Sequence, residues 1–424
     1  MRPPFILLIA VLAVTTAGCD TLFGSKQDET TEEIFEEGRT PPGFVDEVSY
    51  VPLNPFFEQG ANGQPLDAPQ DVYVGYDRFL YVVGEAGLHV LDRAGRPQTF
   101  VDEAAGQPLR DPHAVIQDRR LRLYVAARRD TTIDGMDWNL PVVYQFADVT
   151  TGSPRVTDII WHPFDDNSRT PRTEENPTTA LQDEAVEFTG IAVRANNRLY
   201  VSRRGPVNDE QFINPQNAIL TFAPDSVGRL ENTQALPLSP TRPSLRSAVH
   251  PSDVLTFVQP PQRPSYSNDE FLMAQSPAPG EQLTYAVLSI VPTETPEGRT
   301  IYEANTDFLQ AALNPDGGQG FLYEENKFEN PSDLGFAADG SGYIYVLDAG
   351  TDSLFTFTSN GIEGVSPPPG SDAIAPAPAS FGGTGDGATQ FNDPQGVTYF
   401  DEIVYVADTG NDRIARFRLN TDFE

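Results

Sequence analysis

The sequence is short of cysteine and of positive charge. Cys19 is the only cysteine in 424 residues, so no disulfide bond can form within the chain. Lysine occurs only at Lys26 and Lys327, and 28 basic residues stand against 61 acidic ones, which gives a formal net charge of −33. General binding of nucleic acid through its phosphates needs a basic surface, so this composition excludes it.

Recognisable catalytic motifs are also missing. The sequence contains no Gly-x-Ser-x-Gly, no phosphate-binding loop, no His-Glu-x-x-His and no cysteine besides Cys19. Nucleophilic catalysis therefore has no support, and a non-enzymatic role is favoured. The acidic, lysine-poor composition resembles that of proteins from salt-adapted organisms, in which salt screens self-repulsion. A calcium-loaded surface is the alternative, although no loop has the spaced oxygen ligands of an EF-hand.

The N-terminal residues predict export. Arg2 precedes an apolar run over residues 5–14, which is too short to span a bilayer. The run leads into Ala17-Gly18-Cys19, which resembles the lipobox of bacterial lipoproteins. This resemblance implies a signal peptide over residues 1–18, cleavage before Cys19 and acylation of that residue. An ordinary signal peptide with an incidental cysteine is the alternative.

The acidic, apolar-poor segment that follows predicts a flexible tether over residues 19–44. Acyl chains on one residue would hold the protein at a membrane without a transmembrane helix. We therefore expect an exported, membrane-anchored lipoprotein that faces the periplasm or the cell exterior.

A degenerate repeat fills residues 45–424. Its anchor is a proline, followed two residues later by Asp, Gly or Ala and then by an aliphatic residue, with Phe188 in the proline position of the third copy. The anchors stand at positions 69, 112, 188, 251, 331 and 394. In the first three copies a tyrosine follows the anchor by twelve residues, at Tyr81, Tyr124 and Tyr200. The apolar residues alternate or form short runs between turn residues, which indicates strands.

Six such units predict an all-β, six-bladed propeller with four antiparallel strands in each blade. The last unit ends after its third strand, at residues 414–419. We expect a segment near residues 47–52 to supply the fourth strand, because closing the ring with both termini removes exposed edges.

The best-preserved copy combines a glycine-rich connector, residues 381–387, with Pro-Gln-Gly-Val at 394–397 and Val-Tyr-Val-Ala-Asp-Thr-Gly-Asn-Asp-Arg-Ile at 404–414. It resembles an NHL repeat, and residues 328–357 form a second good copy. The resemblance implies a six-bladed propeller, a fold that includes many binding modules and a few enzymes. Asp348 and Asp408, each followed two residues later by glycine, are predicted to be structural turn residues.

Strand polarity sorts the loops of the predicted blades. The anchors, the turns between second and third strands and the blade-to-blade connections share one face, which we call the anchor face. The long inserts are expected mostly on this face, over residues 128–140, 162–187, 203–216, 303–329 and 366–392. Inserts gathered on one face of a repeat array often mark its binding surface. A binding or scaffolding role for an envelope protein, peptide or glycan is therefore the leading hypothesis.

Two groups of residues are candidates for the site. Four arginines follow the repeat tyrosines at matching offsets and could bind acidic groups beside an aromatic platform: Arg128, Arg129, Arg203 and Arg204, with Trp138. Their alternative role is pairing with nearby acidic residues. The second group surrounds the predicted mouth of the central channel, which is ringed by Gln70, His113, Thr189, Ser252, Ser332 and Gln395.

Next to this ring, Asp71, Asp253 and Asp333 recur at one repeat position. With His113 they could hold a divalent cation such as Ca²⁺ or Zn²⁺. The competing hypothesis is thus a metal-dependent hydrolase or lyase. In the amidating-lyase branch of NHL-like propellers, histidines after the anchor prolines bind zinc, and only His113 matches that position. Alternatively, each aspartate accepts backbone N–H bonds where its strand starts, and no cofactor is bound.

Overall fold

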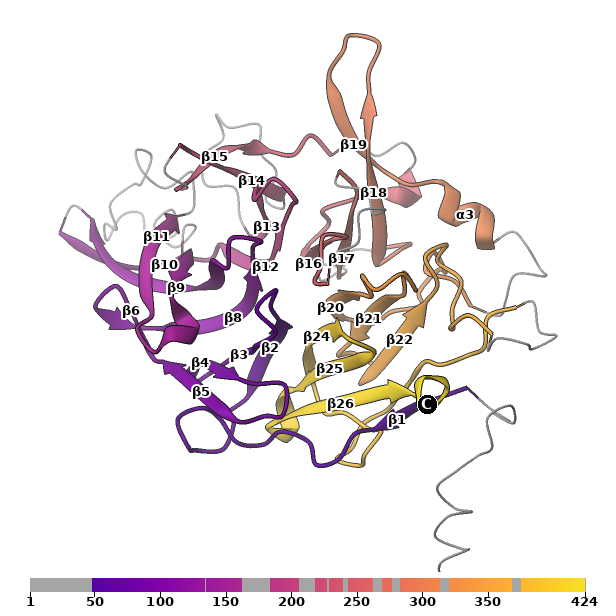
Figure 1. The fold of residues 1–424 in the computed structure, drawn as a ribbon. Helices are drawn as coiled ribbons and strands as arrows, with labels where there is room; N and C mark the ends of the chain where they lie inside the picture. Colours follow the sequence, from indigo (N-terminus) through magenta and orange to yellow (C-terminus); the bar gives the residue numbers. More distant parts are fainter. Residues whose placement is uncertain are drawn as a thin grey trace, which may run out of the picture. The chain divides into compact units, whose positions relative to one another are not determined.

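The computed structural model describes residues 48–133, 135–161, 184–205, 218–226, 229–238, 243–261, 269–276, 283–312, 320–367 and 375–423. These residues form six four-stranded antiparallel sheets arranged in a ring, as a β-propeller (Figure 1). The predicted fold class is confirmed. The predicted signal peptide, Cys19 and the tether lie outside the described residues. Within the part of the chain that is described, no helix is long and apolar enough to cross a membrane.

The strands of each blade run in order from the channel outward, and their bounds follow. Blade 1 has β2 (Pro69–Val74), β3 (Leu80–Gly84), β4 (Gly87–Leu91) and β5 (Pro97–Val101); blade 2 has β8 (Arg110–Gln117), β9 (Leu123–Ile133), β10 (Met136–Ala147) and β11 (Arg155–Trp161). Blade 3 has β12 (Glu187–Val193), β13 (Leu199–Arg204), β14 (Ala218–Pro224) and β15 (Leu230–Ala235); blade 4 has β16 (Pro251–Thr256), β17 (Phe271–Gln275), β18 (Val287–Glu294) and β19 (Thr300–Ala304).

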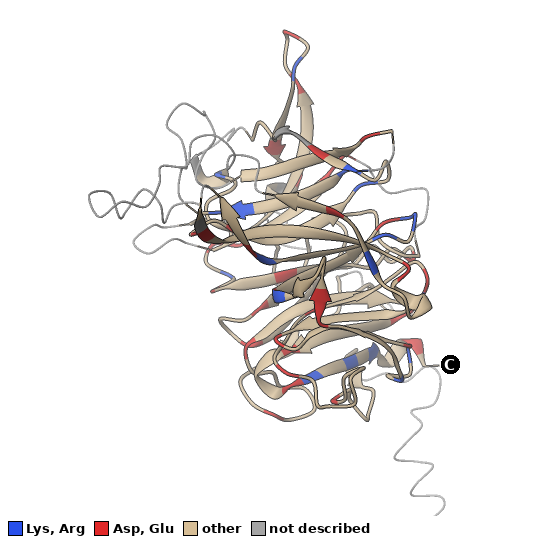
Figure 2. Cartoon of the chain, turned by 90° about the vertical axis from the view of Figure 1, so that its left-hand side faces the viewer, with Lys and Arg blue, Asp and Glu red and all other residues tan. Residues whose placement is uncertain are grey.

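Blade 5 has β20 (Pro331–Phe336), β21 (Ile344–Asp348), β22 (Ser353–Phe357) and β23 (Phe381–Gly382); blade 6 has β24 (Pro394–Phe400), β25 (Ile403–Asp408), β26 (Arg413–Leu419) and β1 (Tyr50–Pro52). A small hairpin, β6 (Glu103–Ala104) with β7 (Gln107–Pro108), precedes blade 2. Helix α3 (Asp307–Ala312) lies between blades 4 and 5. Acidic residues occur on turns and edges of several blades rather than in one place (Figure 2).

The ring is closed as the sequence predicts. β1 pairs antiparallel with β26, with Tyr50 opposite Leu419 and Pro52 opposite Phe417. A further bridge joins Phe57 to Ile414. The N-terminal strand therefore supplies the outermost strand of the last blade, which covers an edge that would otherwise be open.

The repeated tyrosines form the packing between blades. Tyr81, Tyr124, Tyr200, Tyr345 and Tyr405 are almost fully buried, and Leu272 takes the equivalent position in blade 4. Each lies on the second strand, opposite a residue toward the end of the first strand. A large ring at this position fills the wedge between neighbouring sheets, which explains its fixed distance from the anchor.

The two Asp-x-Gly turns are structural, as predicted. The buried carboxylate of Asp348 accepts N–H bonds from Glu329, Asn330 and Gly350 at 2.7–3.0 Å. Asp408 accepts one from Asn392 at 2.8 Å and pairs with Arg413 at 2.7 Å. A Cβ at Gly350 would lie 2.8 Å from the Asn330 nitrogen, so only glycine fits there.

The glycine-rich connector of blade 6 is held by the same turn. The guanidinium of Arg413 donates to the carbonyl oxygens of Asp386, Gly387 and Gln390 at 2.9–3.0 Å. The best-preserved repeat is therefore a scaffold in which one arginine joins the turn to the connector.

Strand polarity places most of the predicted inserts on the anchor face, with one correction. Residues 358–380 connect β22 to β23, and this connection begins at the opposite face, where the turns between first and second strands lie; we call it the turn face. Only residues 383–392 of the fifth insert precede an anchor. This connection could not be detected by sequence reasoning, because β23 has only two residues and lies far along the chain from β22. A further connection on the turn face, residues 257–270, joins β16 to β17 and contains the Pro-rich insertion that the sequence shows at residues 259–264.

Candidate functional site

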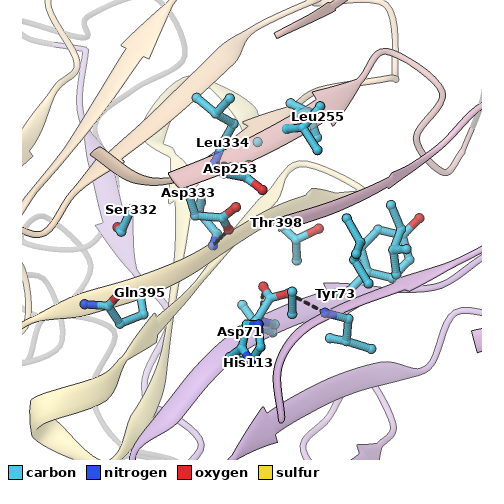
Figure 3. A pocket seen from close by; sticks show the side chains of 18 of the residues that line it. Asp71, Tyr73, His113, Asp253, Leu255, Ser332, Asp333, Leu334, Gln395 and Thr398 are labelled. Atoms are coloured by element: carbon cyan, nitrogen blue, oxygen red, sulfur yellow. Dashed lines mark hydrogen bonds between the residues drawn. The ribbon is translucent and has the colours of Figure 1, made fainter. Parts of the chain in front are cut away.

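The first strands of the blades surround a small central cavity of about 60 Å³, which has room for roughly four water molecules. Its lining includes Asp71, Asp253 and Asp333 together with His113 (Figure 3). The structure thus brings all four predicted channel residues into one place. Four of the six predicted ring residues, Thr189, Ser332, Gln395 and His113, also line it.

A β-bulge follows each anchor and aims the next side chain out of its own sheet. The register of the first strand shifts at this point in every blade. The bulge leaves one residue unpaired and re-aims its side chain. The bulged residues are those of the predicted ring: Gln70, His113, Thr189, Ser252, Ser332 and Gln395.

Most of these side chains bind the neighbouring blade. Each of three hydroxyl groups donates to the carbonyl of the next anchor: Thr189 to Pro251 at 3.0 Å, Ser252 to Pro331 at 2.6 Å and Ser332 to Pro394 at 2.9 Å. Between blades 6 and 1 the donor is Thr409, which lies 2.6 Å from the Pro69 oxygen. The ring therefore joins blades rather than presenting free polar groups to the channel.

His113 occupies the same position between blades 2 and 3. Its Nε2 makes a short contact with the Phe188 carbonyl oxygen, and its Nδ1 lies 2.7 Å from the Asp111 oxygen. Both ring nitrogens thus face backbone carbonyl oxygens. Neither nitrogen presents a lone pair to the cavity.

The three aspartates also connect blades, through backbone N–H groups. Asp71 accepts from Val115 of blade 2 at 2.7 Å. Asp253 accepts from Leu334 of blade 5 at 3.2 Å, and Asp333 accepts from Val397 of blade 6 at 2.5 Å. The aspartates thus accept backbone N–H bonds, which is the alternative role that the sequence suggested. Most of the donors, however, belong to the next blade.

The carboxyl groups have room because the residue at the same repeat position in a neighbouring blade is glycine. A Cβ at Gly190 would lie 2.9 Å from the Asp253 Cα, and one at Gly396 would lie 2.6 Å from the Asp71 Cα. Both distances are shorter than carbon atoms tolerate. The sequence shows Asp at this position in blades 1, 4 and 5 and Gly in blades 3 and 6, but only the ring reveals which of them are neighbours.

Burial strongly favours the protonated forms of these carboxyl groups. Loss of hydration raises the pKa of Asp71 to about 7 and that of Asp253 to about 6. Burial and the negative charges of Asp253 and Asp71 raise the pKa of Asp333 well above its usual value. A hydrogen bond joins the carboxyl groups of Asp333 and Asp253, and it lowers the Asp253 pKa while raising that of Asp333. Burial and this hydrogen bond together favour a proton held between the two carboxyl groups.

The chemistry of this cavity is that of an interblade contact. Among the residues that the structure describes, no group of three or more His, Cys, Asp or Glu side chains is placed to hold a metal ion. The oxygens of the aspartates accept N–H bonds and the nitrogens of His113 face carbonyls, so the ligand atoms are largely occupied. Binding of a divalent cation here stays a prediction.

The turn-face end of the channel is covered by a residue that sequence reasoning missed. The Tyr76 hydroxyl donates to the Val258 carbonyl oxygen across the ring at 3.3 Å, and its backbone N–H donates to Gln117 at 2.8 Å. Tyr76 lies in the turn between β2 and β3, and no repeat signal marks it.

The arginine candidates do not converge on one pocket. Arg128 and Arg129 are consecutive on β9, and Arg203 and Arg204 are consecutive on β13, so the members of each pair point to opposite sides of their strand. Arg203 is 2% exposed, and Arg204 forms a 2.7 Å bond with Glu187.

The guanidinium groups of blade 2 bind protein carbonyls. Arg128 donates to the Asn139 and Glu184 oxygens, both at 2.7 Å. Arg129 donates to the Ala104 oxygen at 3.1 Å and lies over the ring of Tyr144. Trp138 is 3% exposed and packs with Leu140. These side chains brace the extended β9–β10 hairpin, and a ligand would have to compete for the same donors.

Comparison with known proteins yields likenesses of fold only. No protein-family model matches this sequence, and no characterised protein matches it at a significant level of similarity. A Bacteroides thetaiotaomicron protein of unknown function shares 14% identity over 88% of this chain and 77% of its own, with a TM-score of 0.48. An auxiliary nutrient binding protein from Bacteroides ovatus shares 12% identity over 88% and 78%, with a TM-score of 0.45.

Regucalcin from Agrobacterium tumefaciens, a calcium-binding protein, shares 9% identity over 87% of this chain and 96% of its own, with a TM-score of 0.43. At these levels of likeness no activity is taken from any of these proteins. The chain is a six-bladed β-propeller.

Proposed function

We propose that this protein is a lipid-anchored envelope propeller of the NHL-repeat type that binds a protein, peptide or glycan through its anchor face. One observation carries the proposal: the anchor face bears most of the predicted inserts, while most polar groups of the channel are used between blades. The β9–β10 hairpin is the best-defined elaboration, since its strands continue in register from Phe146 opposite Leu123 to Met136 opposite Ile133.

The hairpin is a rigid platform rather than a loose loop. Arg128 binds its base, and Asn139 donates to Asp130 at 2.8 Å across its two strands. Buried Trp138 and Leu140 add an apolar base with Trp161. A rigid projection that stands on a closed ring suits recognition, because little conformational entropy is lost when a partner binds.

The proposed tether fits this arrangement. A flexible segment of the length of residues 19–47 has a root-mean-square span of roughly 30 Å. This length would hold the propeller near a membrane while leaving its anchor face accessible to other envelope components.

A pair of cysteine variants tests the proposal, because Cys19 is the only natural cysteine. Thr132→Cys places a crosslinker on the exposed β9–β10 hairpin, and Glu297→Cys places one on the exposed end of the β18–β19 hairpin, on the turn face. We expect a discrete adduct from Thr132→Cys in intact envelopes and none from Glu297→Cys. Adducts from Glu297→Cys alone, or from neither variant, would refute anchor-face binding.

A metal-dependent hydrolase or lyase is the second candidate, because three carboxyl groups and His113 line one cavity. Metal analysis of the purified protein tests it. Stoichiometric divalent metal that is lost in Asp253→Asn would favour this candidate over the binding module.

A further inference from the structure

The turn face carries a cluster of arginines that the proposed function does not use. The turns between first and second strands contribute Arg78 in blade 1, Arg119, Arg120 and Arg122 in blade 2, and Arg194 and Arg198 in blade 3. Arg78, Arg119 and Arg120 are exposed. The equivalent turns of blades 5 and 6 contain Asp339, Asp401 and Glu402 and no basic residue. The positive charge of the turn face is therefore concentrated over blades 1–3.

Residues 119–122, which we call the basic turn, form a rigid structure. The buried carboxylate of Asp118 accepts N–H bonds from Arg120 at 2.8 Å and Arg122 at 2.9 Å. The Leu121 N–H donates to the Asp118 carbonyl at 2.9 Å, and the neighbouring turn is joined through Gln117 and Tyr76. The exposed arginines thus project from a fixed backbone.

Leu121 is exceptional among the described residues. It is 49% exposed, and its backbone is left-handed, with φ of 61°. The same turn position is also at positive φ in four other blades, where it is Arg78, Asn197, Gly342 and Glu402. The conformation therefore belongs to the turn, but among these blades an apolar side chain stands there only in blade 2. Leucine is strained in this conformation and its exposed side chain gains nothing from burial.

The same face receives the N-terminal part of the chain. β1 begins with Tyr50 opposite Leu419, and Arg418 pairs with Glu402 in the turn between β24 and β25. Ser49 and Asn420 are joined by backbone bonding at 2.9 Å. Val48, where the described part of the chain begins, therefore lies at the turn face, on the opposite side from the proposed binding surface.

We propose that the turn face docks on a membrane, with the exposed arginines on anionic lipid headgroups and Leu121 inserted at the boundary of the acyl chains. An apolar side chain flanked by arginines matches an interface that is negative outside and apolar beneath. This inference deepens the proposed function by naming the face that meets the membrane. The proposed tether only suggests which face is turned toward the membrane. Docking itself can be measured without the lipid anchor.

Repulsion by the acidic residues does not prevent this docking. Asp401 pairs with Arg93, Glu402 with Arg418 and Asp269 with Arg194, so these three acidic groups of the turn face are neutralised by arginines. The anchor face lies about 20 Å away along strands of six residues. That distance exceeds the Debye length of about 8 Å at physiological ionic strength, so its charges are screened from the lipid.

Vesicle sedimentation of the full chain carrying Cys19→Ser, which cannot be acylated, tests the docking. We expect binding to vesicles of phosphatidylglycerol and phosphatidylcholine, weaker binding in about 1 M salt, where the Debye length is about 3 Å, and little binding to phosphatidylcholine alone. Arg78→Ser with Arg120→Ser should weaken partitioning about 30-fold, because each arginine near an anionic surface contributes about fivefold. Arg110→Ser, on the anchor face of blade 2, is the matched control and should leave partitioning unchanged.

Leu121→Asn separates docking from a structural role. The change relieves the backbone strain, so the thermal midpoint should rise, while partitioning into the anionic vesicles should fall about tenfold. Retained partitioning in Leu121→Asn or in the arginine variant, or equal binding to both kinds of vesicle, would overturn the proposal. Self-association that is salt-sensitive, occurs without vesicle binding and is abolished in the arginine variant would also overturn the proposal. It would show that the basic turn binds acidic residues of a second copy. The Thr132→Cys crosslink measures partner binding at the anchor face, and vesicle sedimentation measures membrane docking at the turn face. The two proposals can therefore fail independently.

Discussion

The stability of the ring should depend on pH through the buried carboxyl groups, and Asp253→Asn isolates this effect. The folded state raises the pKa of Asp253 from 3.8 to about 6. The folded protein therefore binds more protons than the unfolded chain between these values. The contribution of Asp253 to stability is fully present below pH 3.8 and is lost as the pH rises through about 6.

The magnitude follows from the pKa difference. A rise from 3.8 to about 6 corresponds to about 3 kcal/mol at 1.4 kcal/mol per pKa unit. An asparagine at this position has nearly the same shape as a protonated aspartic acid, can donate to Asp333 and can still accept the Leu334 N–H. The free energy of unfolding of Asp253→Asn should therefore match that of the wild type near pH 4 and exceed it by up to about 3 kcal/mol near pH 8.

Urea unfolding in EDTA, followed by the fluorescence of the two tryptophans, measures this difference. Other groups titrate in the same range: the pKa of Asp71 is raised to about 7, and burial lowers that of His89 to about 4. His89 is present in both proteins, so its contribution cancels in the difference. The charge of Asp253 raises the pKa of Asp71, so the loss of this charge in Asp253→Asn should add to the difference in the same direction. Asp137→Asn, at an exposed carboxylate of the β9–β10 hairpin, is the matched control. Its difference from the wild type in the free energy of unfolding should not change with pH. A pH-independent difference, or a variant less stable than the wild type at pH 8, would refute the buried, proton-sharing arrangement.

Other predictions concern the contacts between blades, the hairpin and the charge. Gly190→Ala should lower the free energy of unfolding by about 1–3 kcal/mol, because its Cβ would collide with the Asp253 backbone, and a thermal midpoint equal to that of the wild type would contradict the packing described here. Arg413→Gln should destabilise by about 3 kcal/mol or more, because it leaves buried Asp408 without its cation; a loss below about 1 kcal/mol in urea unfolding would argue against this pairing. Arg128→Gln should increase protease cleavage within the β9–β10 hairpin without lowering the global unfolding midpoint, whereas unchanged cleavage would show that Arg128 does not brace it. When KCl is increased from about 0.1 M to about 1 M, the thermal midpoint should rise, because salt screens the net charge of −33. A falling midpoint would contradict salt adaptation.

Local pattern was sufficient to predict the architecture. The anchors, the tyrosines of the second strands and the Asp-x-Gly turns depend on short-range sequence, because each fixes a turn or fills the wedge beside its own strand. The closing strand was also predictable, since a last blade with three strands leaves an edge that only the other terminus can cover. The role of most bulged ring residues was not predictable, because their partner is the anchor carbonyl of the next blade, 62 residues away for Thr189 and 79 for Ser252.

The sequence by itself determined the number of blades, their polarity and which residues gather at the channel, because a repeat places equivalent residues at equivalent positions. Only the tertiary structure decided what those residues do. Asp71, Asp253 and Asp333 became acceptors between blades, and the arginines of blades 2 and 3 became braces within them. The proposed role of Leu121 and its flanking arginines depends on the turns of blades 1–3 lying on one face. The physical reason is common to all of these cases: hydrogen bonds, desolvation and surface charge depend on which blades lie side by side, and no single repeat carries that information.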